Sequence, residues 1–539
     1  MVFNTILIML YAILLTFTRI WLLMLASIGI AIVLGILSAR VKIAGAIIIP
    51  ITDVLEAVPV VSFFPIILVF FIIRVGGSAG VELAVDFLII TALIWNLILG
   101  VYQAVSHIPK ENLEMVKVYR LSFWSRLKHL YLPSSYHQIV ANIMPSFASA
   151  LFYITLSEVI PIGTRNYSVF GVGSLALQFA SENQFGNIGI LIIILILAIA
   201  LNYYLIINPL IEGSKKYVFD LSVKAPEEQR RQRDPFINAL GGRITQVVSA
   251  RLTTFNSLNF GRRTGVSASP RRRFRISDTW LNVISGVILL FFTGLAIYLV
   301  AVSGFAAAFD EYLTNAAFLL KLTLATAYDL LRIVIVFLVS LATMVPLAIY
   351  SARKGGSGRA LTGLFQIIYS VPAPILLPLI IEYITPPISS VVGFGLAFNF
   401  DVLLVTFLSA AAYLYFNVYG AALSIPYELK AVASTFRIKG LRRFKYLSFP
   451  AVVPGLITGS MAAFGSYWGG LQVSEYVSIG NRVYSVNDGL MMLTVKYLNQ
   501  GDLLRVDAID IFMVIVIVAL SFLLWMRLYK YSQKRFSLN

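Results

Sequence analysis

Residues 108–133 read IPKENLEMVKVYRLSFWSRLKHLYLP, and residues 425–450 read IPYELKAVASTFRIKGLRRFKYLSFP. The two segments lie 317 residues apart and share isoleucine, proline, glutamate, arginine, lysine and leucine in register. A proline opens each segment, as is common at the start of a helix, and apolar side chains recur every third residue toward its end. Both segments are too polar to cross a membrane. We therefore expect two surface loops, each containing a helix, built to one pattern.

The repetition extends well beyond these loops. SEVIPIGTRNYSV at 157–169 and SEYVSIGNRVYSV at 474–486 have the same offset of 317 residues. Upstream, spaced residues recur at an offset of 313: Arg19, Ser38, Ala39, Arg40, Pro59 and Pro65 match Arg332, Ser351, Ala352, Arg353, Pro372 and Pro378. A shared composition could repeat an apolar run, but it would not repeat spaced arginines, prolines and glutamates. The chain therefore contains an internal duplication.

The composition indicates that the solvent of this chain is partly lipid. Of the 539 residues, 59% are hydrophobic and only 12% are charged, and the mean hydropathy is +0.86. A soluble protein carries about 25% charged residues. Spans long enough to cross a bilayer are predicted at 5–37, 48–73, 83–104, 137–159 and 187–211, and then at 281–303, 315–350, 364–384, 400–424, 453–474 and 509–528. The first residues lack the features of a cleaved signal peptide, so we expect an uncleaved membrane segment there.

Basic residues fix the expected orientation. The chain has a net charge of +17. Fourteen basic residues and only four acidic ones lie between residues 213 and 276. Such a bias is typical of a cytoplasmic linker, where contact with anionic headgroups is a compatible second role. No aromatic-rich surface accompanies the arginines, so a nucleic-acid partner is not expected. The predicted organisation is a first repeat at 1–212, a linker at 213–275 and a second repeat at 276–539. The N-terminus then lies outside, and the linker and C-terminus lie in the cytoplasm.

The sequence lacks the motifs of an enzyme. There is no cysteine, and the three histidines have no metal-ligand spacing, so we expect no metal site and no cofactor. A Gly-Lys dipeptide never occurs, which excludes the phosphate-binding loop used for ATP hydrolysis. The pattern predicts an all-α polytopic membrane protein with about eleven transmembrane helices in two parallel repeats. We therefore expect a pore-forming subunit, with ATP hydrolysis in a separate subunit.

The loops at 108–133 and 425–450 resemble the EAA loop of ABC importer permeases. The shared features are a proline, a glutamate two residues later, a pair of small or apolar residues, and a closing Leu-x-Pro or Phe-Pro. VPVVSFFP at 58–65, VPAPILLP at 371–378 and the Ser-Glu pairs resemble the nitrate/sulfonate/taurine type of binding-protein-dependent permease. The resemblance implies two fused permease domains of five to six helices each. It also implies two copies of a cytosolic ABC ATPase and an extracellular or periplasmic solute-binding protein as partners, in a cell membrane.

The same resemblance implies which loop residues couple the permease to the ATPase. They are Glu111, Glu114, Arg120, Arg126, Glu428, Arg437 and Arg443. The second loop departs from the family pattern, because alanine replaces the glutamate that corresponds to Glu114. Arg120 and Arg437 occupy the position of the family's glycine, which favours either a different local bend or a charge contact with the ATPase.

Two arginine–glutamate pairs are expected near the outer membrane boundary. Arg19 and Arg332 lie about 32 Å from the inner-face arginines if the intervening chain is helical. Glu158 and Glu475 reach the same level by a similar count. These residues either form structural ion pairs or serve as a gate or an electropositive mouth for an anion. Just beyond them, Arg165, Tyr167, Arg482 and Tyr484 are candidates to face the binding protein, the other repeat or the entering solute.

Deeper polar residues are the remaining candidates for contact with the solute. Asn96 and Asn417 stand out within predicted spans, although buried amides in membrane helices commonly bond only to neighbouring helices. The resemblance points to a small anion of the nitrate, sulfonate, taurine or bicarbonate class. Duplicated permeases for ferric iron or thiamine remain an alternative. A secondary transporter of the major facilitator type is an alternative from another class, since it also joins two helical halves.

Overall fold

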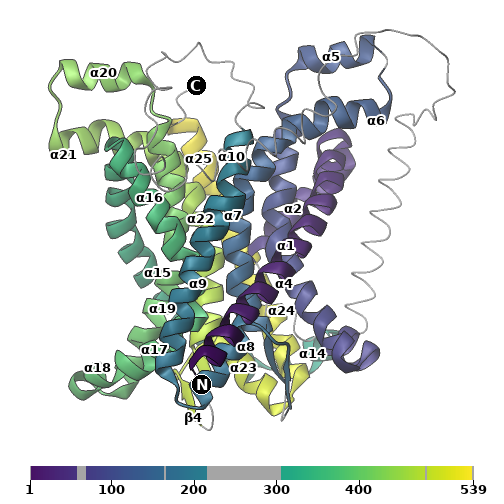
Figure 1. Cartoon of the computed structure of the whole chain (residues 1–539), viewed down its shortest axis with the longest axis vertical. Coiled ribbons are helices and arrows are strands. Elements are labelled where there is room, and N and C mark those ends of the chain that lie inside the picture. The colour runs from purple at the N-terminus through teal and green to yellow at the C-terminus, as the bar shows by residue number, and fades with distance from the viewer. Residues whose placement is uncertain are drawn as a thin grey trace.

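The computed structural model describes residues 2–57, 68–119, 121–162, 165–214, 305–479 and 482–536. These residues are almost entirely helical, and the two halves of the chain stand side by side (Figure 1). Eight helices in this part of the chain are long and apolar enough to cross a membrane. The predicted all-α polytopic membrane fold is confirmed.

The long helices occur as four matching pairs. In the first half they are α1 (Val2–Arg40), α4 (Gly77–Ser106), α7 (Leu132–Ser157) with the preceding turn η3 (Leu127–Tyr131), and α9 (Phe185–Asn202) continued by η4 (Tyr203–Ile207) and α10 (Asn208–Ser214). In the second half they are α15 (Ala316–Arg353), α19 (Phe394–Leu423), α22 (Phe449–Ser474) with η8 (Phe444–Ser448), and α24 (Leu503–Leu520) continued by η9 (Ser521–Trp525) and α25 (Met526–Phe536).

One predicted span is bent at a break in its helix. Residues 364–384 form two helices, α16 (Gly356–Tyr369) and α17 (Ala373–Tyr383), which are bent by 79°. Pro372 lies in the break with an extended backbone, and the residue before a proline is disfavoured in a helix. In the first half, α2 (Lys42–Ala57) and η2 (Leu68–Val75) flank residues outside the described part of the chain. The predicted span 48–73 therefore lies partly outside it and 281–303 wholly so, and the total of eleven spans stays a prediction.

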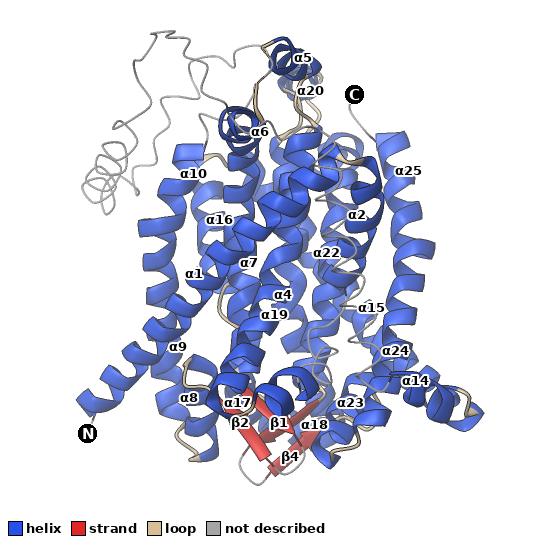
Figure 2. Cartoon of the chain, turned by 90° about the vertical axis from the view of Figure 1, so that its right-hand side faces the viewer, coloured by secondary structure: helices blue, strands red, loops and turns tan. Residues whose placement is uncertain are grey.

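Two β-hairpins and several short helices gather at one end of the bundle, here called the hairpin end (Figure 2). The hairpins join β1 (Val159–Ile162) to β2 (Arg165–Ser168) and β3 (Tyr476–Ile479) to β4 (Arg482–Ser485), both antiparallel. They coincide with the repeated SEVIPIGTRNYSV-type strings. The short elements near them are α8 (Val172–Ser181), α14 (Phe305–Ala308), η7 (Phe309–Leu313), α18 (Thr385–Val392) and α23 (Leu490–Gln500).

The opposite end, here called the loop end, carries the repeated loops. The first loop contains α5 (Lys110–Val118) and α6 (Phe123–Arg126), and the second contains α20 (Tyr427–Thr435) and α21 (Gly440–Arg443). Each helix pair projects beyond the bundle above its own half (Figure 1). The helices α1 and α15 also finish at this end. The described chain therefore begins near the hairpin end and finishes near the loop end.

The same two helices pack closely in each half, but the residues at the contact are exchanged between the helices. A Cβ on Gly100 of α4 would lie 2.5 Å from the Asn142 amide nitrogen of α7. At the matching positions the partners are reversed, because Asn417 lies on α19 and a Cβ on Gly459 of α22 would meet it at 2.8 Å. Each helix pair approaches closely through one asparagine and one glycine. Contacts between the halves run from α17 to α7, α8 and α9, and from α2 to α22.

Candidate functional site

A central cavity of about 500 Å³ lies between the two halves. Both asparagines selected from the sequence, Asn96 and Asn417, line it. The wall comes from α4 and α7 of the first half and from α16, α17, α19 and α22 of the second. The other polar and aromatic lining residues are Asn142, Ser149, Phe152, Tyr153, Gln366, Tyr369, Ser370, Ser409, Tyr413, Phe416 and Ser466.

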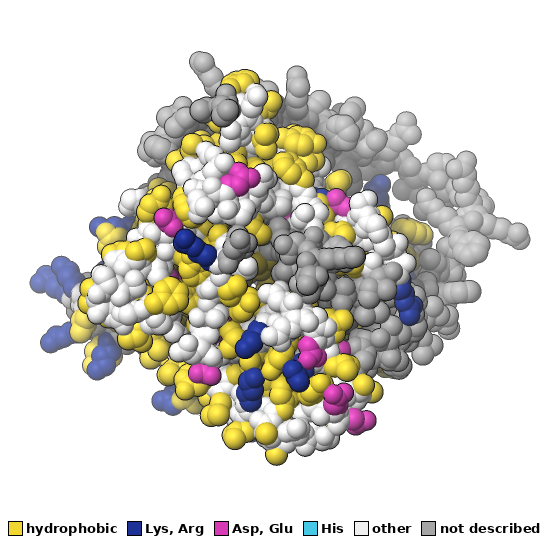
Figure 3. All heavy atoms as spheres, turned by 90° about the horizontal axis from the view of Figure 1, so that it is seen from below, with side chains coloured by type: hydrophobic (Ala, Val, Ile, Leu, Met, Phe, Trp, Pro, Cys, Tyr) yellow, Lys and Arg dark blue, Asp and Glu magenta, His cyan; other side chains and the backbone are white. Residues whose placement is uncertain are grey.

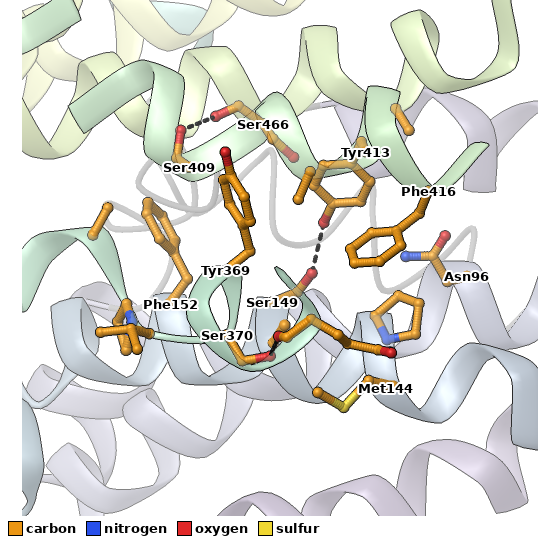
Figure 4. A pocket seen from close by; sticks show the side chains of 18 of the residues that line it. Asn96, Met144, Ser149, Phe152, Tyr369, Ser370, Ser409, Tyr413, Phe416 and Ser466 are labelled. Atoms are coloured by element: carbon orange, nitrogen blue, oxygen red, sulfur yellow. Dashed lines mark hydrogen bonds between the residues drawn. The ribbon is translucent and has the colours of Figure 1, made fainter. Parts of the chain in front are cut away.

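The lining of the central cavity is polar but uncharged. No lysine, arginine, aspartate, glutamate or histidine occurs among its described residues. The hydroxyl oxygens of Ser149 and Tyr413 lie 3.0 Å apart and link the two halves across the cavity (Figure 4). Phe152, Tyr369 and Phe416 add aromatic rings to the same wall. Such a wall can hold a solute through hydroxyl and amide hydrogen bonds and through ring contacts.

A second, outer cavity of about 1,050 Å³ lies nearer the hairpin end. Its described lining, from α7, α8, α17, α22, α23 and both hairpins, is again uncharged. Gln472 lines this cavity with only 4% of its surface exposed, and neither polar atom of its amide has a hydrogen-bond partner among the described residues. A buried amide without a partner is costly, so this side chain is a candidate to contact the solute.

The predicted pair of Arg332 and Glu475 is in contact at the hairpin end of the second half. The Arg332 guanidinium donates to the Glu475 carboxylate at 2.8 Å and to Asp329 at 3.1 Å. It also donates to the Asn399 side chain at 3.1 Å. Both carboxylates accept backbone N–H groups from the first turn of α23, Asp329 from Leu490 at 2.8 Å and Glu475 from Met492 at 3.0 Å.

The first half has the matching cluster with one carboxylate relocated. Arg19 donates to Glu82 at 2.8 Å, lies 3.8 Å from Asp86 and 4.0 Å from Glu158. Glu158 accepts from Thr16 at 2.9 Å and from the backbone N–H groups of the first turn of α8. Thr16 also accepts the N–H of the first residue of α8 at 3.1 Å. Each cluster therefore joins the first long helix of its half to the helix after the hairpin.

The two clusters contain an exchange that the sequence search missed. Thr16 corresponds to Asp329 at the offset of 313, and Glu82 corresponds to Asn399 at the offset of 317. The first half lacks a carboxylate at Thr16 but has one at Glu82. The second half has one at Asp329 but lacks one at Asn399. Comparing every polar residue at these two offsets would have found all four. Because each arginine contacts at least two carboxylates, this geometry favours structural pairing over an electropositive mouth.

The arginine and the tyrosine of the second hairpin, both proposed to face a partner, differ in their exposure. In the second half, Arg482 is exposed on β4, whereas the Tyr484 ring stacks against Phe398 of α19 at 6.3 Å. Arg165 and Tyr167 lie at the matching positions of β2, and their side chains are outside the described part of the structure. Seen from the hairpin end, basic and acidic side chains both lie among apolar ones (Figure 3).

The loop end exposes acidic and apolar side chains together. Glu111 and Glu428 are exposed on the first turns of α5 and α20, and Glu114 is exposed one turn further along α5. Arg126 and Arg443 lie half-buried where each loop joins its long helix. Large apolar side chains are exposed at matching positions of the two loops: Met115 and Val432, Tyr119 and Phe436, and Trp124 and Leu441. Exposed apolar groups repeated on both loops are typical of a docking surface.

Arg437 adopts the left-handed turn that usually carries glycine, so the first of the two alternatives, a different local bend, is wrong for the second loop. Arg437 has a φ of +51°, in the left-handed region. Its N–H donates to the Ser434 carbonyl, and the next N–H, of Ile438, donates to the Ala433 carbonyl at 2.8 Å. This is the Schellman arrangement that usually carries glycine at the helix end. In the first loop, the Leu121 N–H donates to the Val116 carbonyl in the same way, while Arg120 lies outside the described residues.

The duplicated helices, the uncharged cavities between the halves and the two projecting loops define a membrane permease with both of its transmembrane domains in one chain. The family comparison agrees. Residues 31–213 and 344–538 each match the binding-protein-dependent transport system inner membrane component, and the chain belongs to this family. A search of the curated proteins found no match. Membership of this family rules out the major-facilitator alternative.

Proposed function

We propose that this chain forms the complete translocation pathway of an ATP-driven importer. The observation that carries the proposal is the presence of two matching helical loops at one end of a chain whose halves each match the permease family. One ATPase subunit docks on α5 and α6, and a second docks on α20 and α21. The loop end then lies in the cytoplasm, and the hairpin end receives the solute-binding protein.

The solute is proposed to pass through the outer cavity and then the central one. Both are bounded by helices of both halves, so a change in the angle between the halves alters both together. The arginine clusters sit beside the hairpins and hold them to the long helices. The binding protein contacts the hairpin end, where Arg482 is exposed.

The proposed solute class is a small anion of the nitrate, sulfonate, taurine or bicarbonate type, on the strength of the loop and proline motifs. An anion in these cavities is held by hydroxyl and amide donors alone, since no cationic side chain lines their described walls. Such neutral donors give weak binding, which suits a site that must release what it binds.

Among the alternatives, thiamine has support from one observation. The rings of Phe152, Tyr369 and Phe416 line the central cavity, and aromatic faces attract organic cations. Ferric iron has less support, because no group of three acidic or histidine side chains able to hold a metal occurs in the described residues.

Two experiments test the proposal. Co-expression with the cognate ATPase is expected to yield two ATPase subunits per chain by native mass spectrometry. Charge reversal by Glu111→Lys and Glu428→Lys, each alone, is expected to reduce this to one. If both single variants retain two subunits, the loops are not the docking sites.

For the solute, the melting temperature of the cognate binding protein is measured with nitrate, taurine, bicarbonate and thiamine. A shift with one of the anions supports the proposed class. A shift with thiamine alone supports the alternative.

A further inference from the structure

The two cavities are separated at one level of the bundle. On α7, the lining changes from the central to the outer cavity between Tyr153 and Thr155. On α22 it changes between Ser466 and Gln472, and at the start of α17 between Ala373 and the next residue. A solute that moves from one cavity to the other must therefore pass Phe152 and Tyr153 on one side and the segment that follows Ser466 on the other.

At the boundary between the two cavities, α7 carries two aromatic residues and α22 carries two glycines. Phe152 and Tyr153 correspond, at the offset of 317, to Gly469 and Gly470. A Cβ on Gly469 would lie 3.2 Å from the Tyr153 hydroxyl and 3.7 Å from the Phe152 ring. The aromatic rings of the first half therefore extend across the boundary into space that the second half leaves open.

The second half has an aromatic pair of its own, but on the other side of its helix. Tyr467 and Trp468 are fully buried, and the Tyr467 hydroxyl donates to Ser340 of α15 at 3.0 Å. They precede the glycine pair by two residues, which is about 200° around a helix. Their counterparts in the first half are Ala150 and the similarly buried Leu151. The aromatic pair thus faces the pathway on α7 and faces away from it on α22.

We propose that Phe152 and Tyr153, packed against Gly469, form an asymmetric constriction that limits the size of the solute passing between the two cavities. With aromatic pairs on both helices the rings would meet across the boundary, and with glycine pairs on both the boundary would be open. One pair of each kind leaves a gap set by two rings, an arrangement that two identical halves could not form. This inference rests on the pathway proposed above.

The constriction is tested by thiol labelling, for which the chain is suited because it has no cysteine. Ser478→Cys reports on the outer cavity and Ser466→Cys on the central one. Full-length variants are labelled in sealed membranes with a membrane-impermeant methanethiosulfonate reagent, added to the face from which Ser478→Cys reacts. We expect Ser466→Cys to react about tenfold more slowly than Ser478→Cys.

Two further substitutions change the constriction itself. Phe152→Gly is expected to raise the labelling rate of Ser466→Cys about tenfold and to leave that of Ser478→Cys unchanged. Gly469→Leu is expected to lower the Ser466→Cys rate further. The matched control is Leu151→Ala, which removes volume from the neighbouring buried position but not from the pathway. It is expected to leave the Ser466→Cys rate unchanged.

The inference is overturned if Phe152→Gly and Gly469→Leu leave the Ser466→Cys rate unchanged. It is also overturned if Leu151→Ala raises that rate as much as Phe152→Gly, because general loosening of α7 would then explain the result. Labelling requires neither ATPase nor solute. A failure here is therefore distinct from a failure of the proposed function, which the ATPase stoichiometry tests.

Discussion

Gly489 allows the Glu475 carboxylate to reach the first turn of α23, and replacing it with alanine tests the arginine clusters. A Cβ on Gly489 would overlap the nearer carboxylate oxygen of Glu475, and one on Gly171 would overlap that of Glu158. Both glycines have extended backbones, with φ of 173° and 179°, so alanine causes no backbone strain. Any loss of stability must therefore come from displacement of the buried carboxylate.

The expected cost follows from the contacts that move. Displacing Glu475 weakens its hydrogen bond from the Met492 N–H and its ion pair with Arg332. Hydrogen bonds to charged groups contribute about 1.5–3 kcal/mol, and a buried charge left without its partner costs about 3–5 kcal/mol. Because the carboxylate can shift and keep part of these contacts, we expect Gly489→Ala to lower the free energy of unfolding by about 2–4 kcal/mol.

The assay compares melting temperatures of the purified chain in detergent. The matched control is Gly189→Ala, because Gly189 lies within α9 and a Cβ added there would have no neighbouring atom within 4 Å. Alanine in a helix interior is favoured over glycine by about 0.5–1 kcal/mol, so the control is expected to melt at or slightly above the wild-type temperature. If Gly489→Ala and Gly171→Ala have the same melting temperature as the control, the clusters do not hold the hairpins as described.

Three further predictions follow from single features. Arg437→Gly relieves a left-handed arginine and is expected to stabilise the second loop by about 1 kcal/mol, seen as slower hydrogen exchange of the Ile438 amide; unchanged exchange would contradict the assigned turn. Asp329→Thr is expected to destabilise the chain by about 2 kcal/mol, and adding Asn399→Glu is expected to recover part of that loss. A double variant no more stable than Asp329→Thr would contradict the exchange of carboxylates between the two clusters. Gln472→Leu is expected to raise the melting temperature and to raise the KM for uptake, whereas an unchanged KM would remove Gln472 from the pathway.

Much of the architecture was predictable because the duplication presents each feature twice. The offsets of 313 and 317 identified the loops, and the helical rise counted from the inner face placed Arg19 level with Glu158 and Arg332 level with Glu475. The break between α16 and α17 was missed, because hydropathy measures apolar length and not direction. The proline at 372, which ends one helix and begins the next, was the available signal.

Other parts of the site were hidden because they depend on differences between the halves. Thr16 and Asp329 look unrelated until both are seen to accept an N–H from the first residue of the next short helix. Phe152 and Gly469 likewise have opposite character at one position, so a search for shared residues passes over them. The cavities themselves depend on how far apart the two halves stand, which no single helix encodes.

The most direct test of the central claim is solute uptake by reconstituted proteoliposomes. The chain is reconstituted with and without its cognate ATPase, and the radiolabelled solute identified with the binding protein is supplied together with that protein. We predict accumulation that requires both the ATPase and ATP on the loop side of the membrane, and that is unaffected by collapse of a proton gradient. Accumulation by the chain alone, driven by a proton gradient without ATPase or ATP, would contradict the account.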